Sequence, residues 1–379
     1  MAGSPTIGIF GAGWVGLVTG ACFAELGRDV IVRDVVPERI EALKTSRTPF
    51  HEPELSDVLA RNAERIHYTL EADDLASAGV LFICVQTPPT YSGDADLSYV
   101  WTALDDLPHT DERQLLVMKS TVPVGTGEKV RAALDARGLT NVGYVSNPEF
   151  LAEGTAVRDF LNPDRIVIGA FEAEDCAAVE ALYSGIDAPV VRTDVASAEM
   201  IKLAANAFLS TRISFINEIA NVCELVGADV QSVAQGVGLD HRLGPHFFRA
   251  GVGWGGSCFG KDVSALKQLA GNSGYHFQLL AAVIEVNELQ KRRVISKLQK
   301  HLGRLRGKTV AVLGLAFKPD TDDLRDAPSL VIASRLLAEG AVVRTWDPVA
   351  DARDRLIGAT QCATVLEAVA GADAAVIVT

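Results

Sequence analysis

A glycine-rich turn near the N-terminus constrains the fold more than any other feature of the sequence. It follows the β-branched and aromatic run 6–10, precedes the apolar stretch 17–26, and reads Gly11-Ala12-Gly13-Trp14-Val15-Gly16. In a G-x-G-x-x-G turn between strand and helix, one glycine makes the tight turn, one admits a pyrophosphate, and one lets the helix pack on the strand. The helix N-terminus then faces the phosphates. The turn predicts a dinucleotide-binding unit; a glycine turn that only packs a helix on a sheet is the alternative.

An acidic residue at the end of the next expected strand, 29–32, refines this prediction. Asp34 lies 18 positions after Gly16 (34 − 16), where a carboxylate can bind the adenosine ribose hydroxyls. Such a carboxylate would repel the 2′-phosphate of NADP, so we expect NAD as the cofactor. The neighbouring cation, Arg33, is the feature that argues the other way.

The order of expected elements predicts an α/β fold with two Rossmann-like doubly wound domains joined by a long central helix. Further strands are expected at 80–85, 115–119 and 142–145, which gives residues 1–197 a mostly parallel sheet. The pattern over 198–226 is one long helix with Phe208, Phe215 and Val222 spaced by seven, and a second helical block covers 263–298. Strands at 309–313, 342–346 and 374–379 form the second Rossmann-like domain. We therefore expect a cofactor domain at 1–197, a helical dimerisation domain at 198–300 and a C-terminal domain at 301–379.

Composition excludes several classes of partner. Among 379 residues, 35 Lys and Arg face 48 Asp and Glu, a net charge of −13 that argues against nucleic acid and anionic membranes as ligands. The first ten residues lack the pattern of a signal peptide, and no apolar run is long enough to cross a bilayer. The six cysteines show no metal-ligand spacing. We expect a cytoplasmic protein with no disulfide framework and no metal site.

A cysteine after two glycines is the strongest candidate nucleophile. The segment reads Gly255-Gly256-Ser257-Cys258-Phe259-Gly260-Lys261-Asp262 and precedes an amphipathic helix. A helix N-terminus lowers the pKa of a thiol, so Cys258 could act as a thiolate, with Asp262 one turn later on the same face. A buried structural cysteine is the alternative on these local features.

Other polar residues lie where α/β active sites assemble. Lys202 and Asn206 are four apart on the long helix and could stabilise an oxyanion, unless they are a solvated polar stripe. Glu149 and Glu153 follow the strand 142–145, and Thr121 follows 115–119, where its hydroxyl could also simply cap a helix. The cations that could bind pyrophosphates, each alone no more than a surface charge, are Arg242, Lys261, Lys318 and Arg325.

Together these segments resemble the UDP-glucose/GDP-mannose dehydrogenase family from the first glycine turn to the last residue. The resemblance rests on motifs in family order: GAGWVG, STVPVGT, NPEFLAEG, EMIKLAANAF, FINEIAN, GGSCFGKD and GLAFKPDTDDLRDAP. It implies a four-electron oxidation of a nucleotide sugar with NAD, with UDP-glucose giving UDP-glucuronate, a polysaccharide precursor, as the favoured case. The matched cysteine, Cys258, attacks the aldehyde from the first hydride transfer; the thiohemiacetal then yields a thioester that water hydrolyses.

The resemblance also implies roles for individual residues. Lys202 and Asn206 would stabilise the oxyanion, Asp262 would assist proton and water chemistry, and Glu149, Glu153 and Thr121 would share the base, water and proton-transfer steps. The implied cofactor contacts are Gly11, Gly13, Trp14, Val15, Gly16, Asp34, Arg39, Thr87, Thr121, Glu153, Lys261 and Arg325. The implied substrate contacts are Glu149, Phe150, Leu151, Lys202, Asn206, Arg242, Phe247, Gly255 and Lys318. Arg242 matches an arginine that reaches the sugar of a neighbouring subunit, which implies at least a homodimer.

Alternatives follow from the same residues. GDP-mannose and UDP-N-acetylmannosamine dehydrogenases share the reaction and most motifs. A two-electron hydroxyacid dehydrogenase would not need Cys258, and a catalytically inactive nucleotide-sugar-binding protein would not turn over at all. Family members continue past the strand 374–379, so the resemblance also implies a truncated C-terminal domain.

Overall fold

The computed structural model describes residues 5–379, which divide into two compact units after Ala204. The first unit carries the cofactor turn and a large sheet, and the second carries Cys258 and a smaller sheet. Helix α8 (Val195–Val226) begins in the first unit and ends in the second. The mixed α/β class and the long central helix are confirmed.

Within residues 5–204, eight strands form one sheet in the order β3-β2-β1-β4-β5-β6-β7-β8. Neighbouring strands are parallel, except that β6 and β7 run antiparallel. The order β3-β2-β1-β4-β5-β6 is that of a dinucleotide-binding sheet, with the switch point between β1 and β4. The strands are β1 (Ile7–Phe10), β2 (Val30–Arg33), β3 (Ile66–Thr69), β4 (Val80–Ile83), β5 (Gln114–Met118), β6 (Val142–Ser146), β7 (Ile166–Ala170) and β8 (Val190–Thr193).

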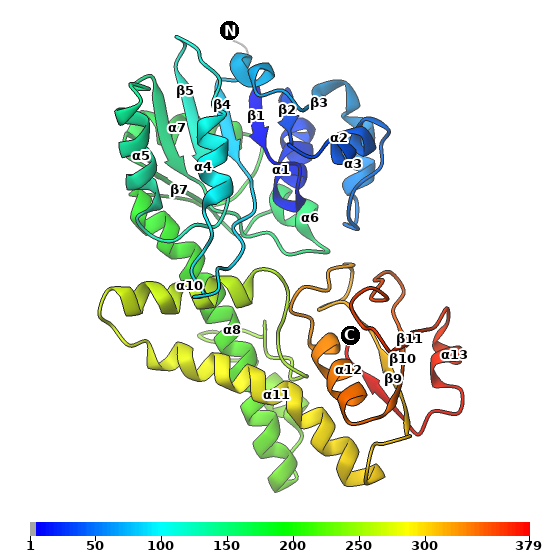
Figure 1. Ribbon diagram of the computed structural model, residues 1–379. Helices are drawn as coiled ribbons and strands as arrows, with labels where there is room; N and C mark the ends of the chain where they lie inside the picture. The colour runs from blue at the N-terminus through cyan, green and yellow to red at the C-terminus, as the bar shows by residue number, and fades with distance from the viewer. Residues whose placement is uncertain (1–4) are drawn as a thin grey trace. The chain divides into compact units, whose positions relative to one another are not determined.

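Helices cover both faces of this sheet (Figure 1). Phe82 of β4 packs into the apolar cluster with α1, whereas its neighbours Leu81 and Ile83 face the cluster with α4 and α5. Because both faces are buried, the strands are continuous apolar runs rather than alternating ones. The helices are α1 (Trp14–Glu25), α2 (Pro37–Lys44), α3 (Leu55–Arg61), α4 (Ser98–Asp105), α5 (Thr126–Ala136), α6 (Ala156–Leu161) and α7 (Ala173–Leu182), with short 3-10 turns at Ala63–Arg65 and Asp73–Ser77.

Within residues 205–379, four parallel strands form a second sheet in the order β11-β10-β9-β12. Apolar residues of β9 and β10 pack with α12 on one face, and Ala311 packs with Ala368 of α13 on the other. The elements are α9 (Val230–Gly238), α10 (Phe259–Asn272), α11 (Gln278–Leu302), β9 (Thr309–Leu313), α12 (Pro328–Ala338), β10 (Val342–Trp346), β11 (Thr360–Gln361), α13 (Val365–Val369) and β12 (Ala374–Ile377).

The observed elements differ from the sequence expectation in two respects. The helical block expected over 263–298 is two helices, α10 and α11, because Gly274 adopts a left-handed φ of +79° between them. Strands β3, β7, β8 and β11 were not predicted. Polar residues interrupt β3, β8 and β11, whereas β7 is an apolar run like the predicted strands and was missed. In the part of the chain that the structure describes, no helix is long and apolar enough to span a bilayer.

Candidate active site

The three glycines of the turn after β1 have separate structural reasons. Gly11 has a left-handed φ of +100°, and a Cβ at Gly16 would lie 1.9 Å from the carbonyl oxygen of Gly11. A Cβ at Gly13 would meet no heavy atom within 4 Å among the described residues. Gly13 is also the N-cap of α1, so its open side adjoins the first turn of that helix. This arrangement fits a pyrophosphate, which needs close backbone approach and a helix N-terminus.

Asp34 lies beside this turn at the end of β2. Its carboxylate accepts hydrogen bonds from the backbone N–H of Ala12 at 2.6 Å and of Val36 at 2.9 Å, and it pairs with Arg39 at 2.8 Å. Arg33 is engaged elsewhere, because its guanidinium pairs with Asp106 at 2.7 Å and donates to the carbonyl of Leu70. The acid therefore borders the cofactor turn, while the cation that could have favoured NADP is directed to other partners.

The ends of β4, β5 and β6 bring the other predicted residues of the first unit together. Thr87 Oγ1 donates a 2.8 Å hydrogen bond to the carbonyl oxygen of Thr121, linking the segments after β4 and β5. Glu149 and Glu153 follow β6 and are both buried. Ligands of open parallel sheets bind at the carboxyl ends of the strands, which is where these residues lie.

Glu149 and Lys202 form a buried ion pair of 2.9 Å, and each side chain is 4% exposed. Burial alone would raise the pKa of Glu149, but the charge and hydrogen bond of Lys202, together with the N–H of Leu151 at 2.7 Å, outweigh it. The pKa of Glu149 is therefore held below its ordinary value. The centroid of the adjacent Phe150 ring lies 3.6 Å from the guanidinium carbon of Arg165 and 5.5 Å from the ammonium of Lys202.

Cys258 is the N-cap of α10 in the second unit, as the sequence predicted for a helix beginning near it. Its thiol is partly exposed, and its Sγ lies 3.6 Å from the hydroxyl of Ser257. Asp262 lies one turn later, since its N–H donates to the carbonyl of Cys258 at 2.9 Å. The other five cysteines, all within residues 5–379, are buried. The geometry separates Cys258 from the structural cysteines, which was the alternative left open by its sequence.

Asp262 connects Cys258 to the long helix. Its buried carboxylate accepts a 2.6 Å hydrogen bond from Asn206 Nδ2 and pairs with Lys261 at 2.8 Å. Asn206 is itself buried, so it is not part of a solvated polar stripe. On α8, Asn206 lies one helical turn after Lys202, so one helix presents both amide and ammonium groups.

The loop after β9 packs against the glycines that precede Cys258. A Cβ at Gly255 would lie 2.3 Å from the carbonyl oxygen of Asp326, and the N–H of Gly256 donates to the carbonyl of Arg325 at 3.0 Å. This loop carries two of the predicted phosphate-binding cations, Lys318 and Arg325. Arg325 pairs with Asp323 at 2.7 Å, and the ammonium of Lys318 lies 5.7 Å from the Phe317 ring.

The predicted substrate residues between α9 and Cys258 lie on an exposed loop. Arg242 forms a two-pronged contact with Asp240, which raises the pKa of the arginine and lowers that of the carboxyl. Phe247 is 43% exposed and has a left-handed φ of +61°, an uncommon conformation for a bulky residue. Strained exposed residues of this kind cluster at ligand sites, which supports keeping Phe247 as a candidate contact.

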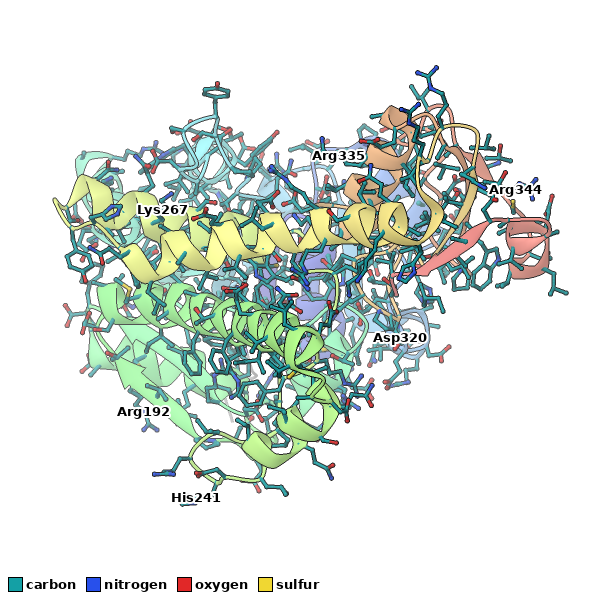
Figure 2. The ribbon with its side chains drawn as sticks, turned by 90° about the horizontal axis from the view of Figure 1, so that it is seen from below. Arg192, His241, Lys267, Asp320, Arg335 and Arg344 are labelled. Atoms are coloured by element: carbon teal, nitrogen blue, oxygen red, sulfur yellow. The ribbon has the colours of Figure 1, made fainter. Side chains whose placement is uncertain are left out.

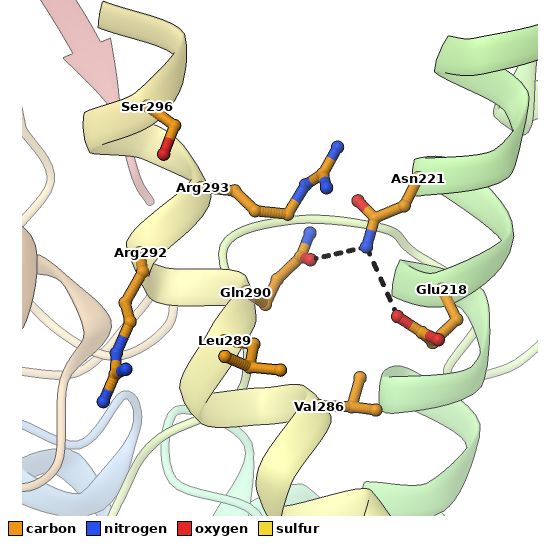
Figure 3. A pocket seen from close by; sticks show the side chains of 8 residues that line it. All are labelled: Glu218, Asn221, Val286, Leu289, Gln290, Arg292, Arg293 and Ser296. Carbon is orange, nitrogen blue, oxygen red and sulfur yellow. Dashed lines mark hydrogen bonds between the residues drawn. The ribbon is translucent and has the colours of Figure 1, made fainter. Parts of the chain in front are cut away.

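The cavity between α8 and α11 is a feature of helix packing. It measures about 340 Å³ and is crossed by hydrogen bonds of Asn221 to Gln290 and to Glu218 (Figure 3). Within the described residues its lining includes none of the predicted site residues. No cluster of three or more potential metal ligands was found in residues 5–379.

Comparison with known proteins identifies the family. Residues 5–187 match the model of the NAD binding domain of the UDP-glucose/GDP-mannose dehydrogenase family, 196–289 match its central domain, and 311–379 match its UDP binding domain. The chain belongs to the UDP-glucose/GDP-mannose dehydrogenase family.

Several relatives of this dehydrogenase chain are characterised by name. It is 47% identical to the UDP-glucose 6-dehydrogenase TuaD of Bacillus subtilis over 350 residues, which cover 91% of this chain and 76% of the relative. A UDP-glucose dehydrogenase structure from Pyrobaculum islandicum superposes with a TM-score of 0.97 at 38% identity, covering 100% of this chain and 91% of that one. A UDP-D-ManNAc dehydrogenase structure from Pyrococcus horikoshii gives a TM-score of 0.88 at 29% identity, covering 99% and 89%.

Sequence reasoning missed three buried charged groups in this dehydrogenase that bind segments next to predicted site residues. Lys119 donates to Asn147 Oδ1 at 3.1 Å and to the Tyr183 hydroxyl at 3.0 Å. Glu199 accepts hydrogen bonds from Gly125 and Gly127, and Glu52 accepts others described below. Charged residues inside otherwise apolar segments were the available signal, but a single sequence does not reveal which of them are buried.

Proposed function

We propose that this dehydrogenase oxidises UDP-glucose to UDP-glucuronate with two NAD, through a covalent intermediate on Cys258. The observation that carries the proposal is the partly exposed thiol at the start of α10, one turn from a carboxylate that Asn206 holds. Two oxidations without release of the aldehyde require a covalent anchor, and a thiolate both adds to carbonyls and leaves from acyl groups. The relatives named UDP-glucose 6-dehydrogenase support the choice of sugar.

The cofactor would bind to the turn after β1 and to Asp34, with Arg39 beside that carboxylate. When bound, NAD supplies the hydride acceptor for each oxidation. We assign further cofactor contacts to Trp14, Val15, Thr87, Thr121, Glu153, Lys261 and Arg325. The open side of Gly13 and the carboxylate of Asp34 are the structural features that fit the dinucleotide.

The Cys258 sulfur would form one bond to the substrate carbon and later break it. The first oxidation converts the 6-hydroxymethyl carbon of the sugar to an aldehyde. The Cys258 thiolate adds to that carbon, giving a thiohemiacetal, and loss of a second hydride gives a thioester. Water then attacks the acyl carbon and the C–S bond breaks, which restores the thiolate and releases the carboxylate product.

Residues on α8 and after β6 would manage charge and protons. The ammonium of Lys202 and the amide of Asn206 suit an oxyanion on the reacting carbon. Glu149 is kept ionised by its pair with Lys202, so it can accept a proton directly or through water. We assign the remaining proton and water steps to Asp262, Glu153 and Thr121 jointly.

The nucleotide part of the substrate would lie on the second unit, whose residues 311–379 match the family's UDP binding domain. We assign substrate contacts to Phe150, Leu151, Phe247, Gly255 and Lys318. In keeping with these roles, we propose a cofactor domain at 1–197, a helical domain at 198–300 and a nucleotide-sugar domain at 301–379.

We propose that the chain works as a homodimer formed through α8. Its residues Phe208, Phe215 and Val222, spaced by seven, are each more than half exposed, and Leu225 and Val226 extend the same apolar surface. Large exposed apolar surfaces usually mark interfaces. Figure 2 shows His241 at the outer edge of the loop after α9. The next residue in the sequence, Arg242, is the one we expect to reach a partner's substrate. We also propose a cytoplasmic location, where reducing conditions would protect the Cys258 thiol from oxidation.

The decisive experiment counts NADH formed per sugar consumed, with UDP-glucose, UDP-N-acetylmannosamine and GDP-mannose offered separately. Two NADH per UDP-glucose are expected, and a Cys258→Ser variant should lose the second oxidation. One NADH per sugar, or unchanged turnover in Cys258→Ser, would refute the covalent route. Preference for UDP-N-acetylmannosamine would select the second candidate, which the 0.88 TM-score to a dehydrogenase of that sugar favours. Tight sugar binding without NADH would indicate a binding protein.

A further inference from the structure

A buried carboxylate outside the predicted site joins the cofactor turn to the loop after β6. Glu52 lies between α2 and α3 and is 6% exposed. Its Oε2 accepts hydrogen bonds from the indole N–H of Trp14 at 2.9 Å and the backbone N–H of Gly154 at 2.8 Å. Its Oε1 accepts the backbone N–H of Ala156 at 2.9 Å. One side chain thus receives donors from segments about 140 positions apart in sequence (154 − 14).

The donors belong to the two segments on which the proposed reaction depends. Trp14 is the first residue of α1, inside the glycine turn. Gly154 ends the loop that begins after β6 and contains Glu149 and Glu153, and it adopts a left-handed φ of +87°. The indole and this loop therefore share one rigid acceptor.

The bonding of Glu52 suits a clamp better than a surface contact. A buried carboxylate is stable only when its oxygens accept hydrogen bonds, and each oxygen of Glu52 does so. Ala156 is the first residue of α6, where a negative charge is also favoured by the helix dipole. Asp159 of α6 accepts the N–H of Ala152 at 3.0 Å, so the two carboxylates together bind the backbone at Ala152, Gly154 and Ala156.

We propose that Glu52 is a positioning residue of the dehydrogenase reaction, which sets the loop bearing Glu149 and Glu153 against the cofactor turn through Trp14. The inference rests on the proposed function. Displacing this loop by about 1 Å would misplace the proton-transfer groups, and misplacements of that size reduce rates by about a hundredfold.

The first test replaces Glu52 by glutamine, which keeps the side-chain volume but turns an N–H group toward one of the donors. We expect kcat/KM for the nucleotide sugar to fall by about ten- to a hundredfold and NADH affinity to weaken several-fold, at temperatures well below unfolding. Glu54→Gln, an exposed glutamate two residues on, is the matched control and should keep wild-type values. A lower thermal midpoint with unchanged kinetics in Glu52→Gln would overturn the proposal.

A double-mutant cycle tests whether Glu52 acts through Trp14. Trp14→Phe keeps an aromatic ring but removes the indole donor. We expect Trp14→Phe to lower kcat/KM for the sugar as well as NADH affinity, and the double variant to be no worse than Glu52→Gln alone. If the effects of the two single variants on kcat/KM simply multiply in the double variant, Glu52 does not act through Trp14. If Glu52→Gln does not fold, Glu52→Asp should show the same pattern in smaller measure, and wild-type kinetics in Glu52→Asp would count against the clamp.

The readouts separate this proposal from the proposed function. NADH affinity, measured by the anisotropy of NADH fluorescence, needs no turnover. A wild-type protein that oxidises none of the three nucleotide sugars would refute the proposed function. The cycle between Glu52 and Trp14 on NADH affinity would still confirm or overturn the clamp.

Discussion

In each unit, an aspartate that follows the second strand of the sheet contacts the connection after the first strand, but the two aspartates have different hydrogen-bond partners. In the first, Asp34 at the end of β2 accepts the N–H groups of Ala12 and Val36 and pairs with Arg39. In the second, Asp347 after β10 accepts the N–H groups of Leu315 and Ala316 at 2.7 and 3.1 Å, and those of Val349 and Ala350 at 2.8 and 2.7 Å. Each oxygen of Asp347 thus accepts two backbone N–H groups, whereas each oxygen of Asp34 accepts one, so Asp347 is more strongly committed to holding its own loop.

The connection between the first strand of each sheet and the helix that follows it also differs between the two units. Helix α1 begins three positions after Gly11 (14 − 11), whereas α12 begins 14 positions after Gly314 (328 − 314). A short turn aims a helix N-terminus at a ligand, while a long loop can place side chains such as Lys318 there instead. The comparison predicts that the first sheet binds phosphates with backbone N–H groups and the second with loop cations.

The largest expected effect breaks the short turn. Gly16→Ala would place a methyl 1.9 Å from a carbonyl oxygen, and overpacking of this kind should lower the free energy of unfolding by about 3 kcal/mol. Gly13→Ala meets nothing within 4 Å among the described residues, so it should keep stability and weaken NADH binding about tenfold. Chemical denaturation and NADH titration of both variants check the pair; equal stabilities would contradict the assigned glycine roles.

A pH experiment sharpens the comparison, because a buried carboxyl with a raised pKa lies in the first unit. Burial raises the pKa of Glu199 to about 7, against the opposing N–H groups of Gly125 and Gly127. The folded protein therefore binds this proton more tightly than the unfolded chain, whose value is 4.5. Its contribution to stability should fall by up to about 3 kcal/mol as pH rises from roughly 4.5 to 7 and stay constant above.

Glu199→Gln removes this titration. The difference in unfolding free energy between wild type and variant should change across that pH window, whereas Glu174→Gln, an exposed glutamate on α7, should show no such change. A pH-independent difference for Glu199→Gln would show that the carboxyl keeps an ordinary pKa.

The next effect concerns Asp347. Asp347→Asn turns an amide N–H toward backbone donors, and loss of these charged hydrogen bonds should cost about 2 kcal/mol. Amide hydrogen exchange should accelerate in β9 and β10, while NADH affinity stays at the wild-type value. Asp34→Asn is expected to weaken NADH binding and to narrow the preference for NAD over NADP. Weaker NADH binding in Asp347→Asn would remove the distinction between the two aspartates.

The smallest effect concerns the loop cation. Lys318→Ala should raise KM for the nucleotide sugar about tenfold without changing NADH affinity, because the loop would lose a charged phosphate contact. Lys308→Ala removes a lysine that pairs with Asp373 at 2.9 Å and is the control for loss of charge alone. Equal increases in KM in both variants would show that Lys318 acts only through its net charge and not through a direct phosphate contact.

The sequence predicted those parts of the molecule that depend on local pattern. The turn at Gly11–Gly16, the strand 309–313, the long helix and the helix start after Cys258 could be located because glycines and apolar periodicity act over neighbouring residues. Roles of individual site residues stay predictions. Glu52 could not have been found, since its donors lie far along the chain and only tertiary structure brings them together.

The cysteines of this protein differ in exposure, which allows one of them to be labelled selectively. Cys258 is the one cysteine in residues 5–379 that is not buried. Burial raises the pKa of the Cys22 and Cys84 thiols far above neutral pH, so these thiols form little of the thiolate that alkylating reagents attack. An iodoacetamide dye in excess, with a short reaction time, should therefore label a single position, Cys258. The amount of dye bound per chain would then measure the fraction of molecules with a reactive Cys258 before any substrate is added.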